Sequence, residues 1–226
     1  MSAKTSSTRK QQRQAAKAKA ARLQKIRYGG IVIVLLLIFA GIAWWRNAGV
    51  VPAEELAAQI SPNLDGPASA PVRVVEYGDL ACSACKRWHN LGIKEQLQAE
   101  FGDQISFEYR HFPVITATSP TGAEAAQCAA EQDAFWPFHD YIYENLEDYP
   151  NLGSQRVKEI ATAVNLDRDA FDNCLDSGKY RNFVTQAIRL ARADGARSTP
   201  TFLINGEQVF PSYEAMSATI AQILNN

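Results

Sequence analysis

The chain has 226 residues, enough for one hydrophobic core of about 150 residues with flanking segments. Its 46% hydrophobic and 21% charged residues are ordinary for a globular domain, and no internal repeat is visible, which argues against a repeat array. The net charge of −1 conceals an asymmetry: residues 1–27 hold nine Lys or Arg and no acidic residue, leaving 14 basic and 24 acidic residues in the remainder. A basic tail joined to an acidic domain calls for a specific explanation.

An apolar segment follows the tail. Residues 31–45 contain no charged group, and residues 28–30 extend the run to eighteen residues. A helix of that length spans about 27 Å, close to the hydrocarbon thickness of a bilayer. Tyr28 and the pair Trp44-Trp45 stand at its two ends, as interfacial anchors do. We therefore predict a basic cytoplasmic tail at 1–27, a single-pass anchor at 28–45, and a domain on the outer side of the cell membrane.

Two alternatives compete with this interpretation. The basic tail is also typical of a nucleic-acid arm, but the adjoining apolar run favours a membrane, so no nucleic-acid partner is expected. A cleaved signal peptide usually has a shorter apolar stretch of about 7–15 residues and a small-residue cleavage site. Here the run ends in Trp44-Trp45-Arg46, a poor site, and 47–49 is only weakly permissive. Either reading delivers the domain to a compartment where disulfides persist.

The segment that carries the chemistry begins after a Pro-rich linker, which we place at 46–71. Residues 72–77 predict a buried strand, Gly78-Asp79 breaks it, and Cys82 and Cys85 follow where a helical pattern starts. A helix N-terminus favours a thiolate, so Cys82 is the expected nucleophile and Cys85, one turn on, the resolving sulfur. Zinc ribbons use the same spacing but need a second ligand pair, which this chain lacks.

The rest of the domain, placed at 72–226, alternates between strands and helices. A strand is predicted at 105–110, an all-helical block at about 114–194, and strands at 201–204 and 208–210 joined by Asn205-Gly206, a strong hairpin signal. A closing helix is expected at 213–224. The three histidines, His89, His111 and His139, receive no role, and no metal site is expected. A cysteine protease would need a Cys–His pair with an orienting group, whereas the Cys-x-x-Cys motif already accounts for the thiol.

This order resembles a thioredoxin fold with a helical insertion, and the chain resembles the membrane-anchored branch of the DsbA-like thiol:disulfide oxidoreductases. The resemblance covers about residues 66–224. It is carried by Ala70-Pro71-Val72, Val75-Glu76-Tyr77-Gly78-Asp79, Cys82-Ser83-Ala84-Cys85, Tyr109-Arg110-His111-Phe112-Pro113, Cys128-Ala129-Ala130-Glu131-Gln132, Phe135-Trp136, His139-Asp140 and Ser198-Thr199-Pro200-Thr201-Phe202-Leu203-Ile204-Asn205-Gly206.

The resemblance implies roles for further residues. It implies a cis peptide before Pro200, and a Thr199 whose backbone pairs with an extended substrate chain. Glu76 matches a buried acid under the active site that would take up a proton from Cys85, although the residue alone also fits a solvent-facing strand position. Cys128 and Cys174 match family cysteines and are expected to pair in an oxidising compartment; two separate buried thiols are the alternative.

The expected function is a dithiol oxidase that forms disulfides in exported thiol-containing proteins through Cys82 and Cys85, with no cofactor beyond that redox-active disulfide. By resemblance, a quinone-linked membrane partner, DsbB-like or VKOR-like, re-oxidises it. Many strongly oxidising relatives carry Pro-His between the cysteines, whereas this chain has Ser83-Ala84, which leaves the direction of exchange open. A reductase or isomerase using the same site, a non-catalytic chaperone or binding module, and a metal-binding module are the alternatives.

Overall fold

The structure is a computed structural model that describes residue 37 and residues 63–226. The predicted tail and anchor and most of the predicted linker lie outside these residues, apart from Leu37, which is helical. Among the described residues, no helix has both the length and the apolar character needed to cross a membrane.

The centre of the domain is a five-stranded sheet in the order β1-β3-β2-β4-β5. Its strands are β1 (Asn63–Asp65), β2 (Val72–Gly78), β3 (Ile105–His111), β4 (Thr201–Ile204) and β5 (Glu207–Val209). β2 and β3 are parallel, and every other neighbouring pair is antiparallel. The parallel pair needs a crossover, which is supplied by α3 (Ser83–Asn90), α4 (Ile93–Phe101) and the short 3-10 helix η1 (Gly102–Gln104).

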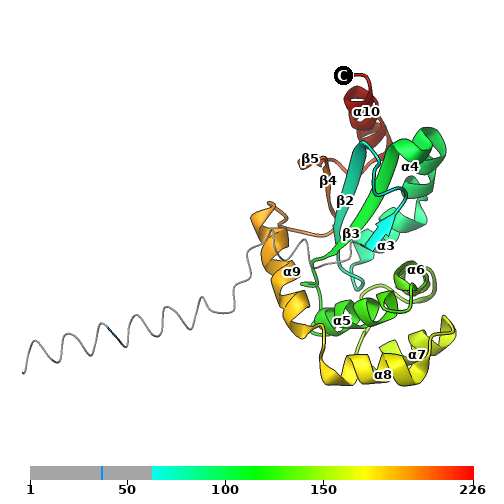
Figure 1. The fold of residues 1–226 in the computed structure, drawn as a ribbon, viewed down its shortest axis with the longest axis vertical. Coiled ribbons are helices and arrows are strands. Elements are labelled where there is room, and N and C mark those ends of the chain that lie inside the picture. The colour runs from blue at the N-terminus through cyan, green and yellow to red at the C-terminus, as the bar shows by residue number, and fades with distance from the viewer. Residues whose placement is uncertain (1–36, 38–62) are drawn as a thin grey trace, which may run out of the picture. The chain divides into compact units, whose positions relative to one another are not determined.

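Helices cover both faces of this sheet (Figure 1). Side chains alternate along β2, so Val72 and Val74 pack with α3, α4 and α10 (Tyr213–Leu224), whereas Val75 and Tyr77 pack with residues of and beyond α9 (Arg181–Ala193). Two separate apolar clusters result, one on each face. Glu76 falls on the α3 side of the strand by the same alternation, which places a carboxyl group within apolar surroundings.

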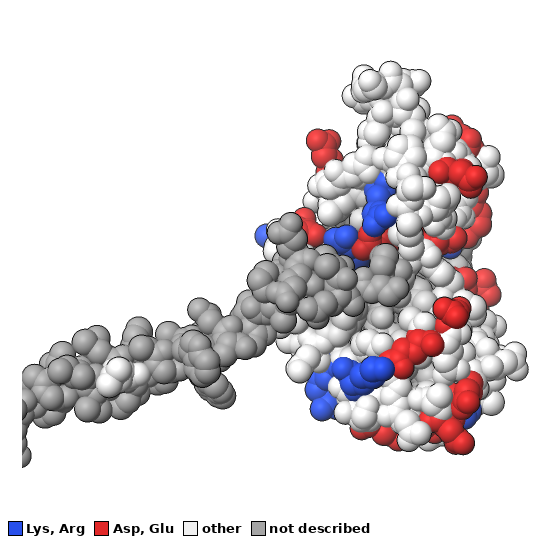
Figure 2. Space-filling model, viewed as in Figure 1, with Lys and Arg blue, Asp and Glu red and all other residues white. Residues whose placement is uncertain are grey.

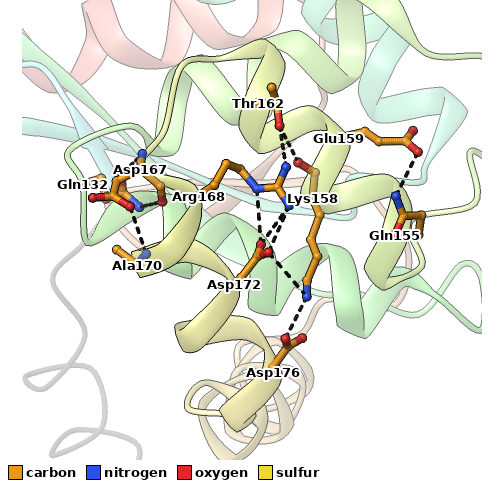
Figure 3. A network of polar contacts seen from close by, with 10 residues as sticks. All are labelled: Gln132, Gln155, Lys158, Glu159, Thr162, Asp167, Arg168, Ala170, Asp172 and Asp176. Carbon is orange, nitrogen blue, oxygen red and sulfur yellow. Dashed lines mark hydrogen bonds and ion pairs between the residues drawn. The ribbon is translucent and has the colours of Figure 1, made fainter.

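The helical insertion runs between β3 and β4. It comprises α5 (Ser119–Ala130), α6 (Phe135–Asn145), α7 (Ser154–Ala163), α8 (Arg168–Ser177) and α9. Its apolar core is continuous with the residues around Cys82 and Cys85, so the insertion packs directly on the start of α3. On the outside of the insertion, Lys158 of α7 joins the two helices by ion pairs with Asp172 at 3.8 Å and Asp176 at 2.8 Å of α8 (Figure 3). Asp172 also accepts from Arg168 within α8.

Two local features differ from the sequence predictions. Residues 63–65, placed in the linker, form β1 and pair antiparallel with the edge of β3, because the outer side of β3 is otherwise unpaired. The helical pattern that begins at the cysteines forms two helices, α3 and α4, because Gly92 adopts a left-handed conformation with φ 63° that interrupts the helical path. The all-helical block predicted at about 114–194 is confirmed, since its helices run from Ser119 at the start of α5 to Ala193 at the end of α9.

Candidate redox site

Cys82 occupies the position immediately before the first residue of α3. Its backbone is extended (φ −87°, ψ 118°), its N–H donates to Asp79 O at 2.8 Å, and its carbonyl accepts the first helical hydrogen bond from Lys86 N at 3.0 Å. The sulfur therefore lies at the positive end of the helix dipole, beside N–H groups that have no partner within the helix. This is the environment that favours a thiolate over a thiol.

Asp79 holds the turn that delivers Cys82 to the helix. Its Oδ1 accepts from Ala81 N at 2.9 Å, and its Oδ2 accepts from both Val114 N and Ile115 N at 2.8 Å. The Asp79 carbonyl also accepts from Tyr143 Oη, on α6, at 3.1 Å. The turn after β2, the loop after β3 and the insertion are thus tied together at one residue. Burial raises the pKa of Asp79, and the three backbone donors oppose that rise.

The loop before β4 brings Thr199 to Cys82. β4 pairs antiparallel with β2, with Thr201 opposite Tyr77, so the residues before Thr201 lie beside the turn that follows Tyr77. The Thr199–Pro200 peptide bond is cis. Cys82 Sγ lies 3.4 Å from Thr199 O and donates to it in the thiol form. Two segments 117 residues apart in sequence therefore meet at the sulfur.

The two sulfurs have opposite electrostatic environments. The pKa of Cys82 is lowered to about 6, chiefly because the Cys85 thiol hydrogen-bonds to its sulfur, with further help from the side chain of Thr199 and from the backbone N–H groups of Cys85 and Ala84. The pKa of Cys85 is raised well above its ordinary value by burial, by the same hydrogen bond and by the charge of Glu76. At neutral pH one sulfur is mostly ionised and the other is a thiol.

Glu76 is the buried acid behind this pair. Its side chain is 7% exposed, and Oε1 has no hydrogen-bond partner among the described residues. Burial raises its pKa to about 8, although the nearby charge of Lys94 acts in the opposite direction. The solvent-facing position that the sequence also allowed for Glu76 is not the one observed. At neutral pH the carboxyl group carries a proton and is electrostatically coupled to Cys85.

Cys128 and Cys174 are joined by a disulfide that links α5 to α8, with Cα atoms 5.8 Å apart. Both lie inside the insertion core, away from any helix start. Cys82 and Cys85, in contrast, are free thiols. The structure therefore places the four cysteines in two pairs with different surroundings.

Sequence reasoning gave Lys94 no role and did not foresee the close packing at Gly78, although both residues shape the site. Lys94, at the start of α4, donates to Asp65 of β1 at 2.8 Å and lies 4.1 Å from the centre of the Trp136 ring, so its charge is held near Glu76. Gly78 allows the Tyr109 ring to pack against the end of β2, since a Cβ there would lie 2.5 Å from that ring. These contacts join separate elements, and no local sequence pattern marks them.

Comparisons with known proteins agree with this geometry. A family model described as thioredoxin matches residues 61–222. The probable disulfide bond formation protein D of Bacillus cereus is 29% identical over 204 residues, which cover 84% of this chain and 93% of that protein. The Na(+)/H(+) antiporter NhaA of Herminiimonas arsenicoxydans is 31% identical over 188 residues, which cover 82% of this chain. The match spans only 29% of the antiporter's length.

Solved structures show the same fold. BdbD from Bacillus subtilis, in its oxidised form, superposes with a TM-score of 0.67 at 24% identity, covering 73% of this chain and 94% of that one. The thiol-disulfide exchange protein alpha-DsbA2 from Wolbachia pipientis gives a TM-score of 0.64 at 16% identity, covering 78% and 95%. The chain belongs to the thioredoxin family, and its described domain is similar to the DsbA-like thiol:disulfide oxidoreductases.

Proposed function

We propose that this protein is a thiol:disulfide oxidoreductase working as a dithiol oxidase, which forms disulfides in exported proteins through Cys82 and Cys85. The observation that carries the proposal is the asymmetry of the two sulfurs across one helical turn. The pKa of Cys82 is about 6, while that of Cys85 lies well above its ordinary value. In such a pair one sulfur reacts with external thiols or disulfides, and the other stays protonated as the resolving sulfur.

The first step opens the enzyme's disulfide. A client thiolate attacks Cys82 Sγ of the oxidised enzyme, a bond forms between client and Cys82, and the Cys82–Cys85 bond breaks. Cys85 leaves with the electron pair, in an environment that disfavours its anion. It therefore requires a proton, and Glu76, protonated at neutral pH because its pKa is about 8, supplies one through its coupling to Cys85.

The second step releases the client. A second client thiolate attacks the client sulfur of the mixed disulfide, the client disulfide forms, and Cys82 leaves as a thiolate. Its low pKa makes it a good leaving group. Two electrons have then moved from the client's dithiol to the enzyme. The reverse sequence would require the stabilised Cys82 thiolate to attack, which the same low pKa makes less favourable.

The low pKa also supports the oxidising direction quantitatively. At pH 7 a thiol of pKa about 6 stabilises the reduced enzyme roughly tenfold relative to a thiol at the ordinary value of 9.0. This corresponds to a reduction potential about 30 mV more oxidising for a two-electron couple. Ser83-Ala84 provides no histidine that could lower the pKa of Cys82. The Cys85 thiol, the side chain of Thr199 and backbone N–H donors lower it instead.

The wider context follows from the sequence. The basic tail and apolar run at 1–45 support a membrane-anchored enzyme whose domain acts outside the cytoplasm on exported proteins. An extended client chain would pair with the Thr199 backbone beside the cis proline, so that main-chain contacts bind and side chains are read loosely. Re-oxidation of the dithiol is assigned to a quinone-linked membrane partner of the DsbB-like or VKOR-like kind.

One equilibrium measurement tests the direction of exchange. The full chain, purified in detergent micelles, is equilibrated with reduced and oxidised glutathione, and the oxidised fraction is read by mass after alkylation. We expect a potential above about −230 mV. A lower potential would assign the same site to reduction or isomerisation instead.

A trapping experiment tests the role of each sulfur, with the two single variants as each other's control. Cys85→Ser, incubated with a client peptide that carries a disulfide, should accumulate a mixed disulfide, because the Cys82 thiolate attacks the peptide disulfide, one peptide thiol leaves, and no Cys85 is present to displace the bound peptide. Cys82→Ser should accumulate none. If Cys82→Ser retained the full biological activity of the parent, the result would instead favour a non-catalytic binding module.

A further inference from the structure

The packing of α3 on α6 brings two histidines and a carboxylate together outside the dithiol. His89 lies on α3, one turn beyond Cys85, and His139 and Asp140 are consecutive on α6. One ligand atom from each of the three residues lies within 4.8 Å of the other two. His139 Nδ1 is 2.7 Å and His89 Nδ1 is 3.9 Å from Asp140 Oδ1. The thiol chemistry proposed above uses none of these groups.

The separations fit a single small cation. Zn²⁺ binds histidine nitrogen and carboxylate oxygen at about 2.0–2.2 Å, so two ligands of a tetrahedral ion lie about 3.4 Å apart. The observed 2.7 and 3.9 Å fall on either side of that value, within reach of small side-chain rotations. Two imidazoles and one carboxylate form a borderline donor set that suits zinc, whereas Ca²⁺ and Mg²⁺ prefer oxygen alone.

The surroundings prepare the imidazoles for this role. His139 is buried, and its ring packs at 4.5 Å from that of Tyr143 and at 5.2 Å from that of Trp136, which restricts its rotation. If His89 binds through Nδ1, its Nε2–H faces Glu144 Oε1, now 3.8 Å away. A carboxylate that accepts from the second nitrogen orients a metal-bound histidine and increases its basicity.

Charge and access also favour a dication. Asp140 and Glu144 contribute two negative charges, which outnumber the single positive charge of Lys94, and Asp65 partly offsets that charge from 2.8 Å. The side chains of Asp140 and Glu144 are 35% and 61% exposed, so an ion can enter from solvent. Three protein ligands leave the fourth position of a tetrahedral ion to water.

We propose that His89, His139 and Asp140 bind one Zn²⁺, with water as the fourth ligand and Glu144 accepting from His89. The ion joins the helix that carries the redox pair to the helical insertion. It is a site of metal binding that the thiol-exchange activity does not require, and its ligands come from α3 and α6, which are also joined where Lys86 donates to the carbonyl of Leu146 at the end of α6.

Equilibrium dialysis of the full chain against Zn²⁺ tests the site. The protein is purified in detergent without a histidine tag, and Cys82 and Cys85 are oxidised beforehand, so that free thiols cannot bind the metal. We expect one Zn²⁺ per chain with micromolar or tighter affinity. His89→Ala and Asp140→Asn should each weaken binding at least tenfold. Arg87→Ala, an equal truncation on the exposed side of α3, is the matched control and should bind as the parent does.

Two further readouts separate this site from general surface binding. Co²⁺ in place of Zn²⁺ should give the strong visible absorption of a tetrahedral ion with nitrogen and oxygen ligands, and His89→Ala should remove it. Zn²⁺ should raise the melting temperature of the parent and of Arg87→Ala but not of His89→Ala. Absence of stoichiometric binding, or equal binding by His89→Ala and Arg87→Ala, would overturn the proposal.

Discussion

The two cysteine pairs of this molecule consist of the same kind of residue but lie in different surroundings. Cys82 and Cys85 are free thiols at the start of α3, where dipole, donors and Glu76 separate their pKa values. Cys128 and Cys174 form a disulfide between two helices of the insertion, within an apolar core. Position relative to a helix start and to a buried acid, rather than burial alone, therefore distinguishes a reactive pair from a structural one, since all four residues are buried.

Removal of the reactive sulfur should have the largest effect. Cys82→Ser is expected to abolish client oxidation completely, because no other sulfur lies at the helix start, while far-UV circular dichroism stays unchanged. The rate of disulfide formation in a reduced client is the measurement. Residual turnover above that of a Cys82→Ser/Cys85→Ser double variant would contradict the assignment of Cys82.

Removal of the structural pair, Cys128 and Cys174, should lower stability and leave client oxidation nearly unchanged. Cys128→Ala/Cys174→Ala opens a loop with a sequence separation of 46 residues and is expected to lower the free energy of unfolding by about 4 kcal/mol in the chain-entropy picture. Client oxidation per folded molecule at 25 °C should stay near that of the parent. Urea unfolding monitored by fluorescence gives the first quantity. A loss of turnover in the folded variant would mean that the two pairs exchange electrons.

Glu76→Gln sharpens the contrast between the pairs. Loss of the proton donor to Cys85 should slow client oxidation about a hundredfold at pH 7, with no change in the Cys128–Cys174 disulfide. The pKa of Glu76 in the folded protein, about 8, exceeds the ordinary value of 4.5, so the contribution of this group to stability is complete below pH 4.5 and is lost as pH rises through 8.

The same substitution therefore has a signature in stability. Between pH 4.5 and 8 the parent should lose up to about 1.4 kcal/mol per pH unit through this group, and Glu76→Gln should lack that slope. Chemical unfolding at several pH values measures it. An unchanged slope in Glu76→Gln would place the carboxyl in water.

The smallest effect concerns ionisation. Alkylation of Cys82 by iodoacetamide should rise with a midpoint near pH 6, against 9.0 for an ordinary thiol, and Cys85 should stay unreactive. Because the pKa is depressed, stabilisation of the reduced enzyme is largest above pH 9 and is lost as pH falls through 6. At pH 7 this stabilisation amounts to roughly tenfold in the exchange equilibrium with a client. A midpoint near 9 would remove the argument for an oxidase.

Much of this arrangement could be predicted from local sequence. Gly78-Asp79, between an apolar run and a helical pattern, predicts that a helix begins near Cys82. Asn205-Gly206 predicts the hairpin of β4 and β5. Both signals depend only on neighbouring residues. The division at Gly92 was missed because one glycine within a helical pattern is tolerated in many helices.

What could not be predicted depends on contacts between distant segments. β1 forms because one edge of β3 is free to pair with it. The positive charge of Lys94 stays near Glu76 because Lys94 donates to Asp65. The tie of Asp79 to the loop at 114–115 likewise joins positions 35 and 36 residues apart. Acidic side chains spread over much of the visible described surface reflect the negative balance of the domain (Figure 2), but the sequence pattern does not show which of them pair.

The meeting of Cys82 with Thr199 has a consequence for biogenesis. A ribosome makes the nucleophile 117 residues before the loop that faces it, so for much of synthesis the growing polypeptide carries a reactive sulfur without its docking strand. Pairing of β4 with β2 brings Thr199 beside the sulfur, and this contact completes the site. Ribosome-stalled chains ending before residue 199 should therefore be poor catalysts, and release of the finished polypeptide should switch catalysis on.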